Sequence, residues 1–200
     1  MNTKAQTDHP VHDLIAERWS PYSFDGRSVP RDALQSLFEA ARWAASSYNE
    51  QPWSYIVATK DDADGFAKVL SCLVEGNQEW AKAAPVLAIG CTALKFSRNG
   101  NPNAAAQHDL GQASAYLALE ATARGLAVHQ MIGILPDRAR ELFQVPEGVQ
   151  PLTGLAIGYV GEASLLPEKL RSRDAGRSKR KRLTEFVFDT KWGTASPITK

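Results

Sequence analysis

Residues Ala41–Trp53 read ARWAASSYNEQPW and join two apolar elements through a polar turn. The stretch begins as the end of an apolar helical pattern and continues into Tyr55–Ala58, which is typical of a buried strand. Four hydrogen-bonding side chains lie within six residues between these elements: Ser46, Ser47, Asn49 and Gln51. Each of them alone is ordinary at a helix end or turn, but their combination is far more specific.

The composition indicates one soluble globular domain. The chain has 200 residues, 44% hydrophobic and 22% charged, which suffices for a hydrophobic core without disulfides or structural metals. The net charge of +1 gives no general attraction to nucleic acid or membrane. Cys72 and Cys91 are isolated, and neither a signal peptide nor a membrane span is recognisable, so we expect a cytoplasmic protein. We expect residues 1–10 to be disordered, 11–193 to form the domain and 194–200 to be a tail.

Two cationic segments lie far apart in the sequence. Arg18 and Ser20 in RWSPYSF combine a planar fork with a hydroxyl, a pair suited to phosphate, although a surface arginine beside a turn serine is the alternative. The run from Arg171 to Arg182 holds seven cations, and a solvated linker or a nucleic-acid-binding tail would have the same composition.

Other elements follow from periodicity. Apolar runs predict strands over 86–91, 151–159 and 183–188, and helical spacing predicts helices over 34–41 and 136–143. Gly76-Asn77 indicates a turn, and 95–107 a loop. Asp109 is expected to cap a helix over 110–124 that is apolar nearly all round, which indicates burial on more than one side and a second subunit. His129, among apolar residues, is expected in the core.

Several of these motifs together resemble the FMN-dependent nitroreductase family. The polar loop matches the family's flavin loop except at Ala45, where proline is usual, and RWSPYSF matches its N-terminal box except at Tyr22, where arginine is usual. GLAIGYVG at 154–161 and RKRLTEFVFDTKWG at 180–193 match its last sheet strand and C-terminus. The resemblance implies an α+β fold with a mixed central sheet flanked by helices, and a domain shared across a homodimer.

The resemblance also implies a site for FMN. Phosphate and ribityl would be held by Arg18, Ser20, Arg180 and Arg182, with Lys181 as the alternative if the match slips by one residue. The ring would be held by Ser46, Ser47, Asn49 and Gln51. Asn77 would reach the flavin edge unless it is a plain turn residue, the Ile132-Gly133 backbone would face N5, and Tyr48 would line the substrate face. Because Tyr22 replaces an arginine, another cation must substitute.

The implied activity is reduction of nitroaromatic or quinone-like acceptors by NAD(P)H, with hydride passing through flavin N5. No metal-ligand spacing, nucleophile motif or dinucleotide fingerprint competes with it, and no residue is an obligatory acid or base. Two alternatives stay open: a flavin carrier or sensor without turnover, and a nucleic-acid binder acting through 171–182.

Overall fold

The fold is built on a four-stranded antiparallel sheet. The computed structural model describes residues 4–174 and 176–199; residues 1–3, 175 and 200 of the expected disordered terminus, basic run and tail lie outside this range. The strand order is β1 (Trp53–Thr59), β2 (Val86–Ala93), β4 (Val149–Gly158), β3 (Ala127–Met131). The α+β class is confirmed. Every pairing between these strands is antiparallel, so the expected mixed sheet is not what the described chain forms.

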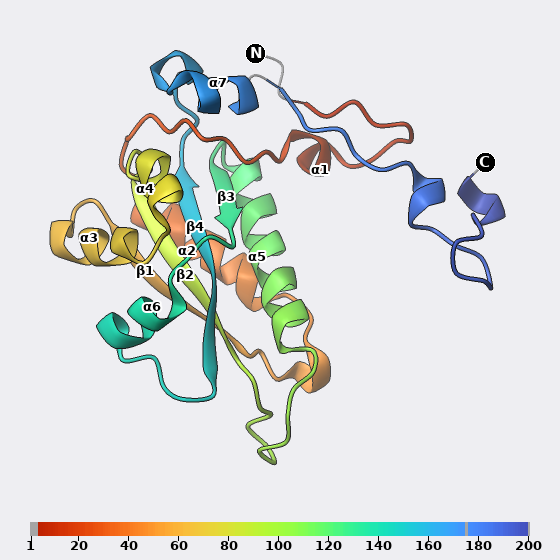
Figure 1. The fold of residues 1–200 in the computed structure, drawn as a ribbon, viewed down its shortest axis with the longest axis horizontal. Helices are drawn as coiled ribbons and strands as arrows, with labels where there is room; N and C mark the ends of the chain where they lie inside the picture. Colours follow the sequence, from red (N-terminus) through yellow and green to blue (C-terminus); the bar gives the residue numbers. More distant parts are fainter. Residues whose placement is uncertain (1–3, 175, 200) are drawn as a thin grey trace.

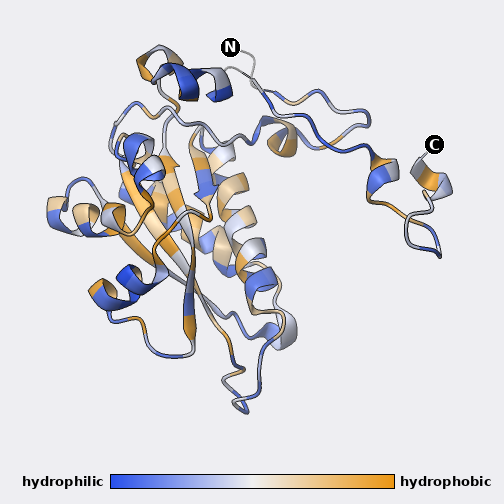
Figure 2. Cartoon of the chain, in the orientation of Figure 1, coloured by the Kyte–Doolittle hydropathy of each residue, from blue (hydrophilic) through white to orange (hydrophobic). Residues whose placement is uncertain are grey.

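The central strand β2 explains why both faces of the sheet are covered. Its side chains alternate between two cores, with Val86 and Ala88 on one side and Leu87 and Ile89 on the other, all nearly inaccessible to solvent. Figure 2 shows hydrophobic colour concentrated on these strands. An apolar run without alternation is therefore the pattern of a strand buried on both faces.

Helices form the outer layers (Figure 1). One core lies between the sheet and α2 (Arg31–Arg42) and α5 (Ala106–Ala123). The other lies under α3 (Ala63–Ser71), α4 (Glu75–Ala81), α6 (Pro136–Phe143) and α7 (Glu168–Asp174). None of the helices in the described chain is long and apolar enough to cross a membrane.

The structure corrects two expectations about helices. Asn77 lies inside α4 rather than in a turn. The helix expected over 110–124 begins earlier, at Ala106, so Asp109 lies in its first turn and is not its cap. Asp109 is 1% exposed and accepts a hydrogen bond from the Ser47 backbone N–H at 3.0 Å. It is an anchor for the polar loop.

The N-terminal segment and the C-terminal segment contact each other through Arg177, which bonds to the Glu17 and Arg18 carbonyls. Ala5, expected in a disordered terminus, donates its N–H to the Ala16 carbonyl of α1 (Asp13–Glu17) at 2.8 Å. The C-terminal segment, residues 176–199, extends away from the sheet in Figure 1. Where a strand was expected, it has the short 3-10 helix η3 (Leu183–Glu185) and a bridge between Phe188 and Ala195. The remaining turns are η1 (Ser47–Asn49), η2 (Ala163–Leu165) and η4 (Pro197–Thr199).

Candidate functional site

Four arginines meet at a cavity of about 620 Å³. Arg18 follows α1, while Arg177 and Arg180 come from the C-terminal segment, and Ser20, Tyr22, His129 and Arg173 also line the cavity. Arg18 donates to the Ser20 hydroxyl at 3.0 Å, the pairing that the sequence suggested for phosphate. Burial and the charge of Arg180 lower the pKa of the Arg18 guanidinium. An arginine stays protonated under such shifts, so the cavity is cationic.

The cations of this cavity have no carboxylate partner in the described chain. The ion pairs of the described residues include none of the four arginines, Arg18, Arg173, Arg177 and Arg180. Asp174, which is close by, accepts the Tyr22 N–H at 2.8 Å, and burial raises the pKa of its carboxyl group. Like charges gathered without a counter-charge disfavour the folded chain unless an anion binds between them. The arrangement is suited to a phosphate group.

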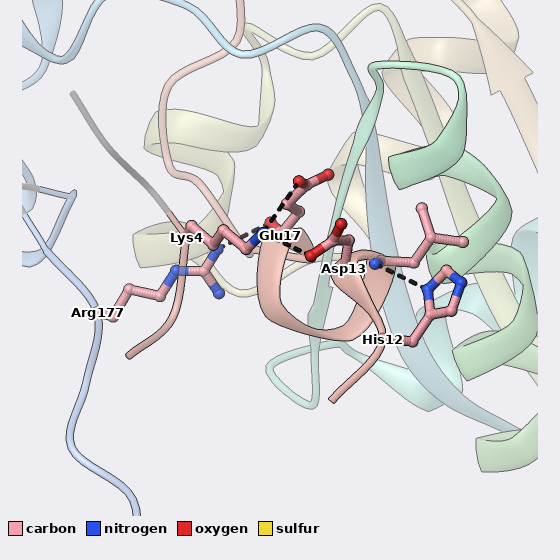
Figure 3. A network of polar contacts seen from close by, with 6 residues as sticks. Lys4, His12, Asp13, Glu17 and Arg177 are labelled. Atoms are coloured by element: carbon pink, nitrogen blue, oxygen red, sulfur yellow. Dashed lines mark hydrogen bonds and ion pairs between the residues drawn. The ribbon is translucent and has the colours of Figure 1, made fainter. Parts of the chain in front are cut away.

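Arg177 joins the two ends of the chain at this cavity. Its terminal nitrogens donate to the Arg18 carbonyl at 2.6 Å and the Glu17 carbonyl at 2.8 Å. Figure 3 shows the side chain reaching α1 from the C-terminal segment. Its Nε is buried and has no hydrogen-bond partner in the described chain. Burial, Arg18 and Arg180 lower the pKa of Arg177. Arg177 therefore both holds Arg18 in place and adds charge to the cavity.

An aromatic cluster forms the wall next to the arginines. The Tyr22 ring lies 5.1 Å from that of Trp80 and 4.7 Å from that of His129, in edge-on contact. His129 Nδ1 is 2.9 Å from the Pro21 carbonyl oxygen, and burial lowers the pKa of the imidazole. His129 is thus a partly buried wall residue rather than a core residue. Tyr22, in place of a cation, fills space against these rings.

Asn77 and Gly133 meet one helical turn from Trp80. The Asn77 amide donates to the Gly133 carbonyl at 2.9 Å. A Cβ at position 133 would stand 2.5 Å from that amide nitrogen and 2.9 Å from a Val74 methyl, so only glycine permits this approach. The neighbouring Ile132 is 73% exposed. The residue therefore lies at the protein surface, where a cofactor could reach it.

The polar loop is held in a strained conformation. Tyr48, Asn49 and Gln51 all have positive φ, near +50°, which is rare for residues other than glycine and concentrates at functional sites. The Ser46 hydroxyl accepts the Gln51 N–H at 3.0 Å, and the Gln51 amide donates to the Asn49 carbonyl at 3.0 Å. With the Asp109 anchor, these bonds keep the loop in one shape.

The polar loop and the arginine cavity lie at opposite ends of α5. Asp109, which anchors the loop, is in the first turn of α5, whereas α1 and the segment after it lie near its last turns (Figure 1). A helix of 18 residues extends about 27 Å. None of the residues lining the cavity belongs to the loop. One chain therefore contains two separate groups of candidate residues.

Arg182 stands apart from the cavity. Its side chain is not among those that line the cavity. Its backbone N–H donates to the Glu185 carboxylate at 2.8 Å, at the start of η3. Arg180 does line the cavity. Of the two C-terminal cations that the sequence selected, this chain brings one to Arg18.

Comparison with known proteins agrees with the fold and the motifs. Residues 15–159 match the Nitroreductase family. This chain belongs to that family. A solved structure described as an oxidoreductase containing FMN has a TM-score of 0.90 at 36% identity, covering 96% of this chain and 98% of that one.

Two relatives extend the comparison to sequences. A 15.4 kDa protein of Mycolicibacterium smegmatis is 32% identical over 66% of this chain and 88% of its own length. The major NAD(P)H-flavin oxidoreductase of Aliivibrio fischeri is 34% identical over 46% of this chain and 43% of its own. The nitroreductase-family assignment thus rests on most of the domain.

Sequence reasoning about this nitroreductase-family chain missed Arg177 and Arg173 as cavity residues. Both stood in the basic run, but the direction of Arg177 depends on its contact with Arg18, 159 positions earlier. The described residues contain no cluster able to hold a metal ion. The donors that are present, arginines and hydroxyls at one group and amides at the other, fit a phosphorylated ring cofactor such as FMN.

Proposed function

We propose that this protein is an FMN-dependent oxidoreductase that uses NAD(P)H to reduce small oxidised acceptors. The observation that carries the proposal is the cavity of four arginines that make no ion pair in the described chain, in a chain of the Nitroreductase family. The similar solved structure is described as containing FMN, which supports the same cofactor here.

In this proposal Arg18, Ser20, Arg177 and Arg180 bind the phosphate and ribityl chain. Arg177 takes the place of the arginine that Tyr22 replaces, because it is the cation that bonds directly to the Arg18 backbone. Asn77 orients the Gly133 backbone, and Ile132 and Gly133 border the ring. When bound, the flavin supplies the two-electron chemistry that these side chains lack.

We further propose a homodimer in which each flavin touches both copies. The polar loop with Ser46, Ser47, Asn49 and Gln51 lies a full α5 length from the cavity, farther than one flavin extends. A loop from a second copy would complete each site. α5 leaves Gly111, Ala115 and Tyr116 exposed, and this small, mostly apolar surface is suited to close packing on another copy.

The acceptor class follows from the family, whose members include nitroreductases, and we propose nitroaromatics or quinones. Tyr48, which is 74% exposed beside the polar loop, would line the acceptor side. The buried free thiols of Cys72 and Cys91 fit the cytoplasm, where we place the protein.

The test is the visible spectrum of the purified protein. We expect a yellow protein with FMN absorbance that bleaches when NAD(P)H is added anaerobically and recovers when a nitroaromatic or quinone follows. A protein that stays colourless after incubation with FMN would refute the proposal. A bound flavin that NAD(P)H fails to reduce would indicate a carrier or sensor, and nucleic-acid binding that falls steeply with salt would indicate the basic-tail function.

A further inference from the structure

Residues 95–102 form a cationic hairpin that contacts the polar loop. They turn back on themselves, with a bridge between Lys95 and Pro102 and a bond from the Phe96 N–H to the Asn101 carbonyl at 2.9 Å. The hairpin is tied to the loop by the Ser97 N–H, which donates to the Glu50 carboxylate at 2.6 Å. The two segments therefore form one surface.

Tyr48 is the centre of that surface. Its backbone has φ of +55°, which is uncommon for a residue other than glycine, and the residue is 74% exposed. The Phe96 ring meets it edge-on at 5.7 Å. The Arg98 guanidinium lies 4.1 Å from the centroid of Tyr48 and 5.4 Å from that of Phe96. An arginine stacked on two rings is restricted in direction while its outward N–H groups remain available.

The charge around Arg98 is positive. Residues 94–108 include Lys95 and Arg98 but no aspartate or glutamate. Arg98 makes no ion pair in the part of the chain that the structure describes. The nearest carboxylate on the polar loop, Glu50, is bonded to the Ser97 backbone. A ligand approaching the loop on this side meets a planar cation above an exposed ring.

We propose that Arg98 is a specificity-determining residue that selects aromatic acceptors bearing a carboxylate or another anionic group. Tyr48 offers the acceptor an aromatic surface, and the Arg98 fork binds its anionic group. The assignment rests on the proposed function, because the polar loop that carries Tyr48 is the segment proposed to hold the flavin ring. It adds to that function the charge of the substrate.

The experiment compares two acceptors that differ in charge and little in shape, 4-nitrobenzoate and 4-nitrobenzamide. The holoprotein is assayed for kcat/KM with each, for the parent, Arg98→Ala, Arg98→Glu and the control Arg138→Ala. Arg138 is an exposed arginine on α6, away from the hairpin, so its removal changes net charge by the same amount. FMN affinity is measured for every variant.

We expect Arg98→Ala to lower the ratio of kcat/KM for 4-nitrobenzoate to that for 4-nitrobenzamide by about fivefold to tenfold, the effect of one exposed charge at short range. Arg98→Glu should lower the ratio further, and Arg138→Ala should leave it within about twofold. The parent's preference for 4-nitrobenzoate should shrink as salt is raised, since screening weakens exposed charges.

An unchanged ratio in Arg98→Ala would overturn the assignment, as would an equal change in Arg138→Ala. If Arg98→Ala instead lowers the rate of flavin reduction by NADPH relative to NADH and leaves the acceptor ratio alone, the anion bound is a dinucleotide phosphate and the acceptor assignment is wrong. Failure of the parent to bind flavin, or to pass electrons from NAD(P)H to any nitroaromatic or quinone, would refute the proposed function itself, so the two failures are distinguishable.

Discussion

Arg177 and Arg182 both belong to the basic C-terminal segment, but only Arg177 lines the arginine cavity. A charge-assisted hydrogen bond to phosphate contributes roughly 1.5–3 kcal/mol, which corresponds to a tenfold to hundredfold change in affinity. Arg177→Ala should therefore weaken FMN binding by about that range, and Arg182→Ala should have a much smaller effect. Flavin fluorescence titration measures both.

Riboflavin provides the control, because it lacks the phosphate. Its affinity should be nearly the same in the parent, Arg177→Ala and Arg182→Ala. If Arg177→Ala loses FMN and riboflavin equally, the residue acts only by holding Arg18 and α1 in place. A loss of FMN in Arg182→Ala as large as in Arg177→Ala would return the phosphate contact to Arg182.

His129 should make stability depend on pH. Burial is the main reason that its pKa is lowered; Arg18 lowers it further, while the Pro21 carbonyl and Asp174 oppose the shift. The folded chain then binds this proton more weakly than the unfolded chain, so the free energy of unfolding rises with pH until the unfolded-state pKa of about 6.5. His129→Gln should flatten this rise, as measured by urea unfolding of the flavin-free protein in phosphate-free buffer.

Asp174 supplies the contrasting case beside His129. Burial raises the pKa of its carboxyl group, so the folded chain holds that proton more tightly and loses stability as pH rises from about 3.9 through the raised pKa. Asp174→Asn should remove this opposite slope and should enlarge the His129 rise, because the Asp174 carboxylate opposes the lowering of the His129 pKa. An unaltered rise in His129→Gln would show that another group titrates there.

At the scale of elements, α5 has two faces with separate roles. Leu117 is fully buried in its own chain's core against the sheet, whereas Ala115 is exposed. Leu117→Ala should lower the free energy of unfolding by about 2–5 kcal/mol through the cavity that it leaves. Ala115→Glu should keep the fold and weaken association of two copies, because it places a charge in the proposed contact.

Native mass measurement and urea unfolding, made on both α5 variants, separate these effects. We expect Leu117→Ala to stay dimeric and Ala115→Glu to shift toward folded monomer. A parent protein that is a folded, flavin-binding monomer would contradict the shared site.

The whole molecule is predicted to build each site from two copies, and complementation tests this. Arg18→Ala removes a cavity residue, and Asn49→Gly with Gln51→Gly removes loop amides at positions whose positive φ glycine accepts. Each variant alone should bind FMN weakly. In mixed dimers one of the two sites receives both intact halves, so co-expression should restore about a quarter of the parent's flavin under random pairing. No recovery in isolated mixed dimers would place both halves of the site in one chain.

The sequence by itself determined the elements whose signals are local. Pro136 at a helix start and the apolar period after it correctly predicted α6 over 136–143, and an unbroken apolar run predicted β2. The polar loop was also visible, because its residues are adjacent in the chain. Such patterns report backbone bonding and burial within a few residues, and the resemblance to a family extended them to a fold class.

Tertiary structure alone decided which residues meet. Asp109 anchors Ser47 across 62 positions instead of capping its helix, and Arg177 reaches Arg18 across 159. Tertiary contacts likewise decided the antiparallel order of the sheet and which face of α5 is covered. A side chain's direction depends on packing and charge from distant segments, and no local period encodes these. For that reason the arginine cavity, and the distance that separates it from the polar loop, were visible only in the folded chain.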